Sequence, residues 1–394
     1  MVDGEQPLSL LDEADVVVAS PGVSRHRPEA IALRAAGRLT GGTALFLAEH
    51  GGEGVVGITG SKGKSTTTAL LHHLWSALHQ GGVALGGNLG VAPLRLLAEG
   101  CGPGTCVALE VSSYQATDVE VSPTIGVLTA LAPDHLSWHG GFEAYVRDKL
   151  NLFAHGTEHV AVAADVDEDL VRGRLPGAVR YGGDQGWHAE GGRVMRGSQA
   201  ALDLAVSPLP GPHNARNLCG VLTVLELVGL DPMGRANEVE AAVASFRPLP
   251  FRLEPIGSVD GREIIDDSIS TNPSAAIAAL SSFPGRPVTI VLGGADRDLD
   301  LSSLADAVAT RVEPTTAVCT GPVGARLAPL LPVDRRLRAT GFDDAVRRAL
   351  SACPVGGVVL VSPGAPSFDE FESYRERGAR VRSLLGFVAP RPEL

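Results

Sequence analysis

The chain has 394 residues, which is enough for two or three domains and a large buried core. Its hydrophobic (44%) and charged (20%) contents are typical of a soluble globular protein, and its net charge of −12 argues against a nucleic-acid or anionic-membrane partner. No apolar run is long enough to span a membrane, and the N-terminus lacks the pattern of a secretion signal. We therefore expect a cytoplasmic protein, and we expect its cysteines to be buried, reduced thiols (Cys101, Cys106, Cys219, Cys319 and Cys353).

Short apolar runs alternate with longer helical patterns along the chain. The expected buried strands are 15–19, 55–59, 106–111, 126–130, 159–163, 263–265, 288–292, 317–320 and 358–362. The expected helices between them include 65–79, 215–228 and 342–352. This alternation predicts an α/β fold with parallel sheets wrapped by helices, in which ligands bind at the carboxyl ends of the strands. Residues 184–199 alternate glycine, tryptophan and charged residues, and they predict a hairpin.

Two boundaries divide the chain into three predicted domains. The first lies near His50–Gly54 and the second near Phe246–Arg252, where the segment FRPLPFR follows a helical pattern. The predicted domains are residues 1–49, 50–248 and 249–394. The first of these is too short for a complete strand–helix domain.

The segment TGSKGKST, residues 59–66, is the most informative motif. It lies between an apolar strand and a helical pattern, so its backbone N–H groups and the helix N-terminus favour phosphate binding. Lys64 can reach outer phosphates and the Ser65 hydroxyl can bind Mg²⁺. The match to the P-loop pattern is incomplete because Ile58 replaces the first glycine, and the competing interpretation is a surface turn. We expect nucleoside triphosphate binding by the residues of this turn (Gly60, Ser61, Lys62, Gly63, Lys64, Ser65 and Thr66).

Four ionisable residues come at or after the ends of the next strands. Glu110 ends one strand, Asp134–His135 follows another, and Lys149 lies in a helical pattern fourteen residues later. A carboxylate and an imidazole at neighbouring strand ends beside a P-loop suit one or two Mg²⁺ ions. Taken singly, such residues are more often turn, cap or solvent-facing groups.

Polar loops also follow the later strands. Asn214 and Asn217 stand at a helix start, where their amides could bind adenine or cap the helix. Arg252 could reach a transferring phosphate. The loops IDDSISTNP, GGADRD and SPGAPSFDEF, which contain Asp267, Thr271, Arg297 and Ser367, indicate one side of a binding site.

The ordered set TGSKGKST, GGNLG, LEVSSYQ, DHLSWHG, HNARN, PLPFR and SPGAPSFDEF resembles the Mur ligases, which build the peptide stem of peptidoglycan. The resemblance extends from Val16 to about Gly386 and is strongest to the branch that adds glutamate. It implies a central P-loop ATPase domain, a C-terminal Rossmann-like domain for glutamate and ATP, and a partial N-terminal domain for the UDP substrate. It also implies that ATP phosphorylates a carboxylate, which the glutamate amine then attacks to form an amide.

The resemblance also implies roles for individual residues. Lys149 would be carbamylated by CO₂ and would bind Mg²⁺ with Ser65, Glu110 and His135. Catalysis would depend on Lys64, His135, Lys149 and Arg252, and the nucleotide would also contact Asn214, Asn217, Arg252 and Asp267. The other substrates would contact Ser20, Asn88, His135, Thr271, Arg297, Ser367 and Tyr374. The implied partners are small molecules, without nucleic acid or membrane, and the implied state is a monomer.

Two positions bear on the handedness of the glutamate. D-glutamate ligases usually carry lysines where this chain has Ile269 and Arg297. One ammonium group is thus lost and another is replaced by a guanidinium near the carboxylates of the incoming glutamate. This change favours the branch that adds L-glutamate, and D-glutamate is the alternative.

The chain also begins with only the second half of the family's UDP-binding domain. We therefore expect a longer version to be more stable and to bind the UDP substrate more tightly. Two further alternatives are a relative that joins another amino acid or folate to glutamate, and a P-loop regulatory module without ligase activity.

Overall fold

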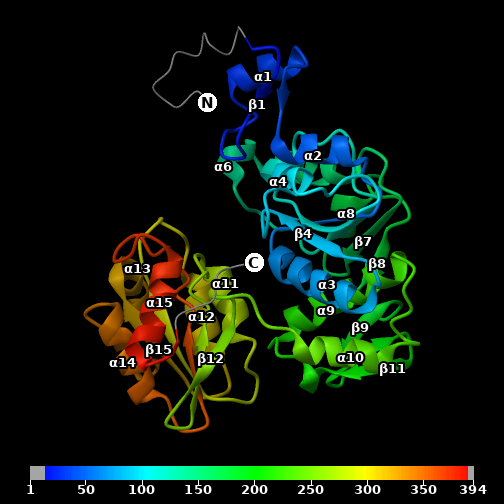
Figure 1. Cartoon of the computed structure of the whole chain (residues 1–394). Helices are drawn as coiled ribbons and strands as arrows, with labels where there is room; N and C mark the ends of the chain where they lie inside the picture. Colours follow the sequence, from blue (N-terminus) through cyan, green and yellow to red (C-terminus); the bar gives the residue numbers. More distant parts are fainter. Residues whose placement is uncertain (1–13, 389–394) are drawn as a thin grey trace. The chain divides into compact units, whose positions relative to one another are not determined.

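The computed structural model describes residues 14–388, which form two compact units (Figure 1). The first contains the residues up to Ser207 together with Ala215–Phe246, and the second contains Pro208–Asn214 together with the residues from Arg247 onward. The predicted division into domains 1–49, 50–248 and 249–394 stays a prediction.

The first unit is built on a six-stranded parallel sheet in the order β4-β5-β3-β6-β7-β8. These strands are β3 (Val55–Thr59), β4 (Val83–Gly87), β5 (Cys106–Glu110), β6 (Ile125–Leu128), β7 (His159–Ala163) and β8 (Val179–Tyr181). Strands β3, β6 and most of β5 and β7 are buried, as expected for a parallel sheet covered by helices.

Several helices accompany this sheet: α2 (Gly42–His50), α3 (Lys64–Leu78), α4 (Pro93–Ala98), α5 (Ser113–Ala116), α6 (Leu136–His139), α7 (Phe142–Leu150), α8 (Glu168–Val171), α9 (Pro212–Leu227) and α10 (Ala236–Ser245). The N-terminal segment adds β1 (Val17–Val18), α1 (Pro28–Ala35) and β2 (Leu39–Thr40), in which β1 and β2 are parallel. A separate antiparallel sheet contains β9 (Trp187–Glu190), β10 (Arg193–Arg196) and β11 (Gln199–Asp203).

The second unit has a six-stranded sheet in the order β12-β13-β17-β14-β15-β16, in which only β12 is antiparallel to its neighbour. Its strands are β12 (Glu254–Val259), β13 (Arg262–Asp266), β14 (Val288–Gly293), β15 (Thr315–Thr320), β16 (Arg336–Arg338) and β17 (Val358–Val361). Its helices are α11 (Pro273–Leu280), α12 (Ser302–Thr310), α13 (Gly321–Leu327), α14 (Phe342–Ala352) and α15 (Tyr374–Leu385).

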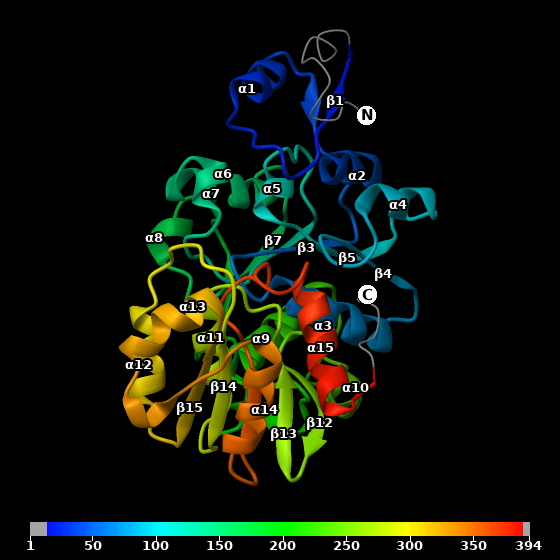
Figure 2. The same ribbon diagram turned by 90° about the vertical axis from the view of Figure 1, so that its left-hand side faces the viewer.

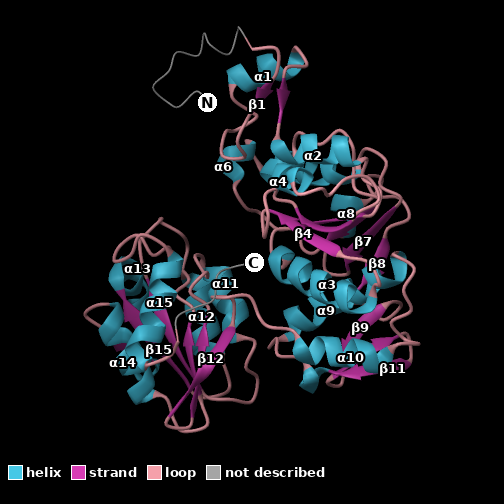
Figure 3. Ribbon diagram, in the orientation of Figure 1, coloured by secondary structure: helices cyan, strands magenta, loops and turns pink. Residues whose placement is uncertain are grey.

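Helices cover both faces of the second sheet, which Figures 2 and 3 show. Successive strand residues enter different cores: Ile290 and Leu292 pack with α11, α12 and α13, whereas Val291 packs with α14 and α15. This alternation is the two-residue period of a strand buried on both faces.

The α/β prediction is confirmed, with local corrections. The strand expected at 15–19 is only β1, and the expected hairpin at 184–199 lies within a three-stranded sheet. The helix expected from residue 215 begins at Pro212. All five cysteines are free, but Cys101, on the loop before β5, and Cys106, the first residue of β5, are only half-buried. Among residues 14–388, no helix has the length and apolarity needed to cross a membrane.

Candidate active site

The P-loop motif lies between β3 and α3, in the strand–turn–helix context that phosphate binding requires. Gly60 and Gly63 both have positive φ angles, of 153° and 85°. A Cβ on Gly60 would lie 2.1 Å from Thr129 Oγ1, and one on Gly63 would lie 2.8 Å from Asn217 Oδ1. The turn therefore needs glycine at both positions, and the predicted Asn217 lies directly beside it.

Two lysines share one acceptor at this turn. Lys64 Nζ donates to the Gly60 carbonyl oxygen at 2.7 Å, and Lys149 Nζ donates to the same oxygen at 3.1 Å. Lys149 also lies 3.4 Å from Thr59 Oγ1, and its Nζ is 4.9 Å from the centre of the Tyr145 ring. The structure thus brings together two amines that are 85 residues apart in the sequence.

Lys149 is a buried amine with an altered acidity. Only 1% of the residue is exposed, and burial lowers the pKa of Lys149 well below its usual value, with the nearby charge of Lys64 acting in the same direction. A lowered pKa increases the fraction of uncharged, nucleophilic amine at neutral pH. This environment suits a lysine that reacts with an electrophile.

Glu110 ends β5 with a carboxylate that is only half satisfied. Its Oε1 accepts a hydrogen bond from Asn88 Nδ2 at 3.0 Å, whereas its buried Oε2 has no hydrogen-bond partner among the described residues. Glu110 is 1% exposed. A buried carboxylate oxygen without a donor fits a cation ligand, since burying a charge without a partner is costly.

His135 lies on the exposed loop before α6 and has a left-handed φ of 51°. Its Nε2 is 3.4 Å from Asp134 Oδ2. Half of its side chain is exposed, and the partial desolvation of the ring lowers the pKa of His135; Asp134 opposes this shift, and the charges of Lys64, His139 and Lys149 add to it. A neutral imidazole beside two lysines keeps a lone pair for a metal ion.

Two further predicted residues of the first unit, Ser65 and Ser20, lie on different elements. Ser65 is buried in the first turn of α3, and its binding of Mg²⁺ stays a prediction. Ser20 is exposed on the loop after β1, where its carbonyl oxygen accepts a hydrogen bond from Arg25 at 3.0 Å.

In the second unit, Asp267 is the most perturbed predicted residue. Its Oδ2 accepts a hydrogen bond from Ser362 Oγ at 2.7 Å, and its Oδ1 accepts one from the Leu253 N–H at 3.1 Å. Burial raises the pKa of Asp267 to about 7, against the effect of these hydrogen bonds. Arg252 also lowers the pKa of Asp267, so the two predicted residues influence one another.

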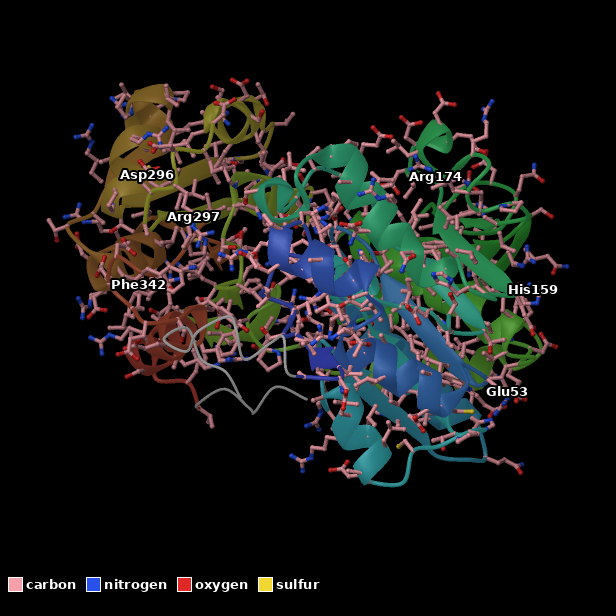
Figure 4. The ribbon with its side chains drawn as sticks, turned by 90° about the horizontal axis from the view of Figure 1, so that it is seen from above. Glu53, His159, Arg174, Asp296, Arg297 and Phe342 are labelled. Carbon is pink, nitrogen blue, oxygen red and sulfur yellow. The ribbon has the colours of Figure 1, made fainter. Side chains whose placement is uncertain are left out.

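The predicted glutamate-binding residues lie on the loops and helix start of the second unit. Thr271 comes directly before Asn272, which caps α11 by accepting a hydrogen bond from the Ala275 N–H. Arg297 is exposed on the loop after β14, and Figure 4 labels it beside Asp296. Ser367 is buried, and Tyr374 begins α15 with its ring edge-on to Phe251 at 5.8 Å.

Asn214 belongs to the second unit and Asn217 to the first, although both lie in α9. Asn214 is the third residue of α9, and its Nδ2 donates to the Pro210 carbonyl oxygen at 2.7 Å. It is therefore not an N-cap, and its contact with adenine stays a prediction.

Sequence reasoning missed Tyr145, whose hydroxyl lies 2.6 Å from Ser61 Oγ in the P-loop. Tyr145 precedes Lys149 by four residues in α7, so both side chains face the P-loop. The signal was therefore available in the helical spacing, once Lys149 had been chosen.

Known proteins resemble this chain in sequence and in fold. Residues 58–225 match the Mur ligase middle domain, and residues 251–364 match the Mur ligase glutamate ligase domain. The chain is 43% identical, over 98% of its length and 85% of the relative, to a UDP-N-acetylmuramoyl-L-alanine–L-glutamate ligase of Xanthomonas oryzae. A ligase of the same name from a Micromonospora species is 42% identical over 100% of this chain and 87% of its own.

Solved structures show the same fold at lower identity. The MurF ligase of Thermotoga maritima in complex with ADP has a TM-score of 0.62 at 21% identity, covering 87% of this chain and 81% of its own. The UDP-N-acetylmuramate–alanine ligase of the same organism has a TM-score of 0.62 at 18% identity, covering 94% of this chain and 84% of its own.

Proposed function

The chain belongs to the Mur ligase family, and from this premise we propose that it joins L-glutamate to UDP-N-acetylmuramoyl-L-alanine with the use of ATP. The observation that carries the proposal is the 42–44% identity, over nearly the whole chain, to relatives that are named for this reaction. The predicted architecture of the family and its class of ATP-dependent, amide-forming ligase are thereby confirmed.

The reaction forms one amide bond and cleaves one phosphoanhydride bond. The substrate carboxylate attacks the γ-phosphorus of ATP, and ADP leaves. The glutamate amine then attacks the acyl phosphate, an amide forms, and inorganic phosphate leaves with the electron pair of the C–O bond. Lys64, on the P-loop, would neutralise charge on the transferring phosphoryl group, and the resemblance to the family implies the same role for Arg252.

The first unit offers a suitable set of ligands for Mg²⁺. Glu110 Oε2, the Ser65 hydroxyl and His135 would hold it, and the bound ion supplies charge neutralisation for the phosphates. Lys149 would complete the set as a carbamate: its neutral amine bonds to the carbon of CO₂, and the amine proton is released to solvent. The buried carboxylate oxygen of Glu110 and the lowered pKa of Lys149 support this assignment.

The specificity for L-glutamate would depend on the loops of the second unit. Ile269 and Arg297 replace the lysines usual in D-glutamate ligases, and a guanidinium binds a carboxylate with two parallel hydrogen bonds rather than as a point charge. Thr271, Ser367 and Tyr374 would complete the pocket. We propose that the enzyme acts as a cytoplasmic monomer on these small molecules.

The test offers the purified enzyme each glutamate enantiomer with ATP, Mg²⁺ and UDP-N-acetylmuramoyl-L-alanine. We expect phosphate release and amide formation to be faster with L-glutamate, by roughly tenfold or more, because one misplaced charge contact costs at least about 1.4 kcal/mol. Faster turnover of D-glutamate would contradict the handedness. ATP binding without turnover of either enantiomer would indicate a regulatory module.

The carbamate has its own test. Lys149→Ala should lose roughly 100-fold or more of the activity, because a metal ligand is removed. A short carboxylic acid such as acetate should partly restore it by occupying the position of the carbamate, whereas the same acid should not stimulate Lys64→Ala.

A further inference from the structure

A series of hydrogen-bonded polar side chains ends at Asp148, the residue before Lys149 in α7. Ser113 Oγ is 2.9 Å from His139 Nε2, and His139 Nδ1 is 2.8 Å from Asp148 Oδ2. His26 Nε2 reaches the same carboxylate oxygen, also at 2.8 Å. His139 is fully buried, Ser113 and Asp148 are nearly so, and His26 is partly exposed.

An ionised carboxylate only accepts hydrogen bonds, so both imidazoles donate to Asp148. Between Ser113 Oγ and His139 Nε2, the hydroxyl donates when His139 is neutral and accepts when His139 is protonated. Burial raises the pKa of Asp148, but the hydrogen bonds from His139 and His26 outweigh it, so the carboxylate stays ionised at neutral pH.

The same three side chains could also be considered as metal ligands, because their donor atoms lie within 4.8 Å of one another. However, ligands of a tetrahedral ion with bonds of about 2.1 Å lie about 3.4 Å apart. The two N···O separations of 2.8 Å are those of hydrogen bonds. The geometry therefore favours a hydrogen-bonded chain.

His26 comes from the loop that carries Ser20. We define the substrate-side loop as residues 19–27. The neighbouring Arg25 is buried in an ion pair with Asp118 at 2.7 Å and donates to the carbonyl oxygens of Ala19, Ser20 and Val23. This loop is thus held in shape by Arg25 and joined to α7 by His26.

Asp148 and Lys149 are consecutive residues of α7, so their side chains point about 100° apart. Asp148 faces the substrate-side loop, whereas Lys149 faces the Gly60 carbonyl oxygen. A contact that fixes Asp148 also fixes the rotation of the last turn of α7, and it thereby fixes the position of the Lys149 amine.

We propose that His26 is a positioning residue, which orients Lys149 for carbamate formation by holding Asp148 from the substrate-side loop. The inference rests on the proposed function, because it assumes the Lys149 carbamate. It means that the loop expected to contact the sugar nucleotide also supports the metal-binding lysine, through a hydrogen bond rather than through the substrate.

The test compares three variants of the full chain. His26→Phe keeps a ring near Trp138 but removes the donor, and His26→Gln restores an N–H at the position of Nε2. Ser24→Ala is the control for general loosening of the loop, because Ser24 Oγ donates to the Trp138 carbonyl oxygen at 2.6 Å and accepts from the His26 backbone N–H at 3.3 Å, but does not touch Asp148. Should the larger ring disturb folding, His26→Ala gives the same comparison.

Two measurements are made: the dependence of activity on bicarbonate concentration, and the carbamate signal in ¹³C NMR with labelled bicarbonate. In His26→Phe we expect the half-saturating bicarbonate concentration to rise roughly tenfold and the carbamate signal to fall, as is typical for loss of a group that orients a metal ligand. His26→Gln should recover most of both, and Ser24→Ala should match the wild type.

Equal shifts in His26→Phe and Ser24→Ala would overturn the inference, because general loosening of the loop would then be the cause. An unchanged bicarbonate dependence in His26→Phe would also overturn it. So would a stoichiometric transition metal bound by His26 and His139. A wild-type protein without a carbamate signal would instead refute the carbamate itself, and this inference with it.

Discussion

At the scale of single residues, burial shifts two ionisable groups towards their neutral forms. The pKa of Lys149 is lowered because burial desolvates its ammonium group, and the charge of Lys64 adds to this effect. The pKa of Asp267 is raised because burial desolvates its carboxylate. Neither environment can be read from the sequence, because each depends on residues far along the chain, such as Gly60 for Lys149 and Ser362 for Asp267.

Asp267 predicts a pH dependence of stability with a definite sign. Its pKa is raised from 3.8 to about 7 in the folded state, so between these values the unfolded chain releases a proton that the folded chain retains. The folded state therefore loses stability as the pH rises from about 4 to about 7, by up to about 1.4 kcal/mol per pH unit. Asp267→Asn should abolish this loss in urea unfolding at a series of pH values.

The control for this measurement is Asp300→Asn. Asp300 is exposed, and a hydrogen bond from the Ser302 N–H lowers its pKa, so its contribution is lost as the pH falls rather than as it rises. A constant difference in unfolding free energy between wild type and Asp267→Asn from pH 4 to pH 8 would refute the raised pKa.

At the scale of elements, continuous apolar runs identified the buried strands well. The expected bounds of β3 and β7 match the structure, because both strands are continuous runs that are almost wholly buried. The strand β12, with sequence EPIGSV, was missed because it is antiparallel at the sheet edge and half exposed, so it lacks an apolar run. Short helices such as α5 depend on a capping box at Ser112 and Gln115 rather than on periodicity.

The candidate site was predictable to the extent that its residues follow strands. Lys64, Glu110 and His135 were identified because loops at the carboxyl ends of parallel strands converge. His26 and Asp148 were not identified, because their contact joins segments 122 residues apart and neither belongs to a local motif. Long-range polar contacts of this kind leave no periodic signal in one sequence.

Close packing of β6 against the segment after α7 gives a prediction for an element. Gly126 pairs with Gly57 of β3, and a Cβ on Gly126 would lie 2.4 Å from the ring of Phe153, which is buried. Gly126→Ala should therefore lower the unfolding free energy by about 1–3 kcal/mol through overpacking. Urea unfolding measures this change.

Gly82→Ala is its matched control. No atom lies within 4 Å of a Cβ at Gly82, and its φ is not in the left-handed region. Its effect should stay within about 0.5 kcal/mol. Equal effects of the two substitutions would show that the packing of Phe153 against Gly126 can relax to accept a methyl group, which would contradict the prediction.

At the scale of the whole molecule, each unit has its own sheet and core. The second unit contains all of β12 to β17 and two hydrophobic cores, one on each face of the sheet. The first unit also includes the later segment Ala215–Phe246, which follows a short stretch that belongs to the second unit. Its helix α10 contacts α3, where the Ala242 carbonyl oxygen lies 3.0 Å from His73 Nε2.

This arrangement predicts which fragments fold. Residues 247–394 should fold alone, because they retain the second sheet and both of its cores, and residues 1–246 should also fold. Residues 1–207 should not, because removal of α9 and α10 exposes the buried side of α3 and removes the hydrogen bond from Arg235 to the Leu78 carbonyl oxygen at 2.8 Å. Circular dichroism during urea unfolding distinguishes a cooperative transition from its absence. A cooperative transition in 1–207 equal to that of 1–246 would contradict the assignment of α9 and α10 to the first core, whereas a non-cooperative 247–394 would show that the second unit depends on the first.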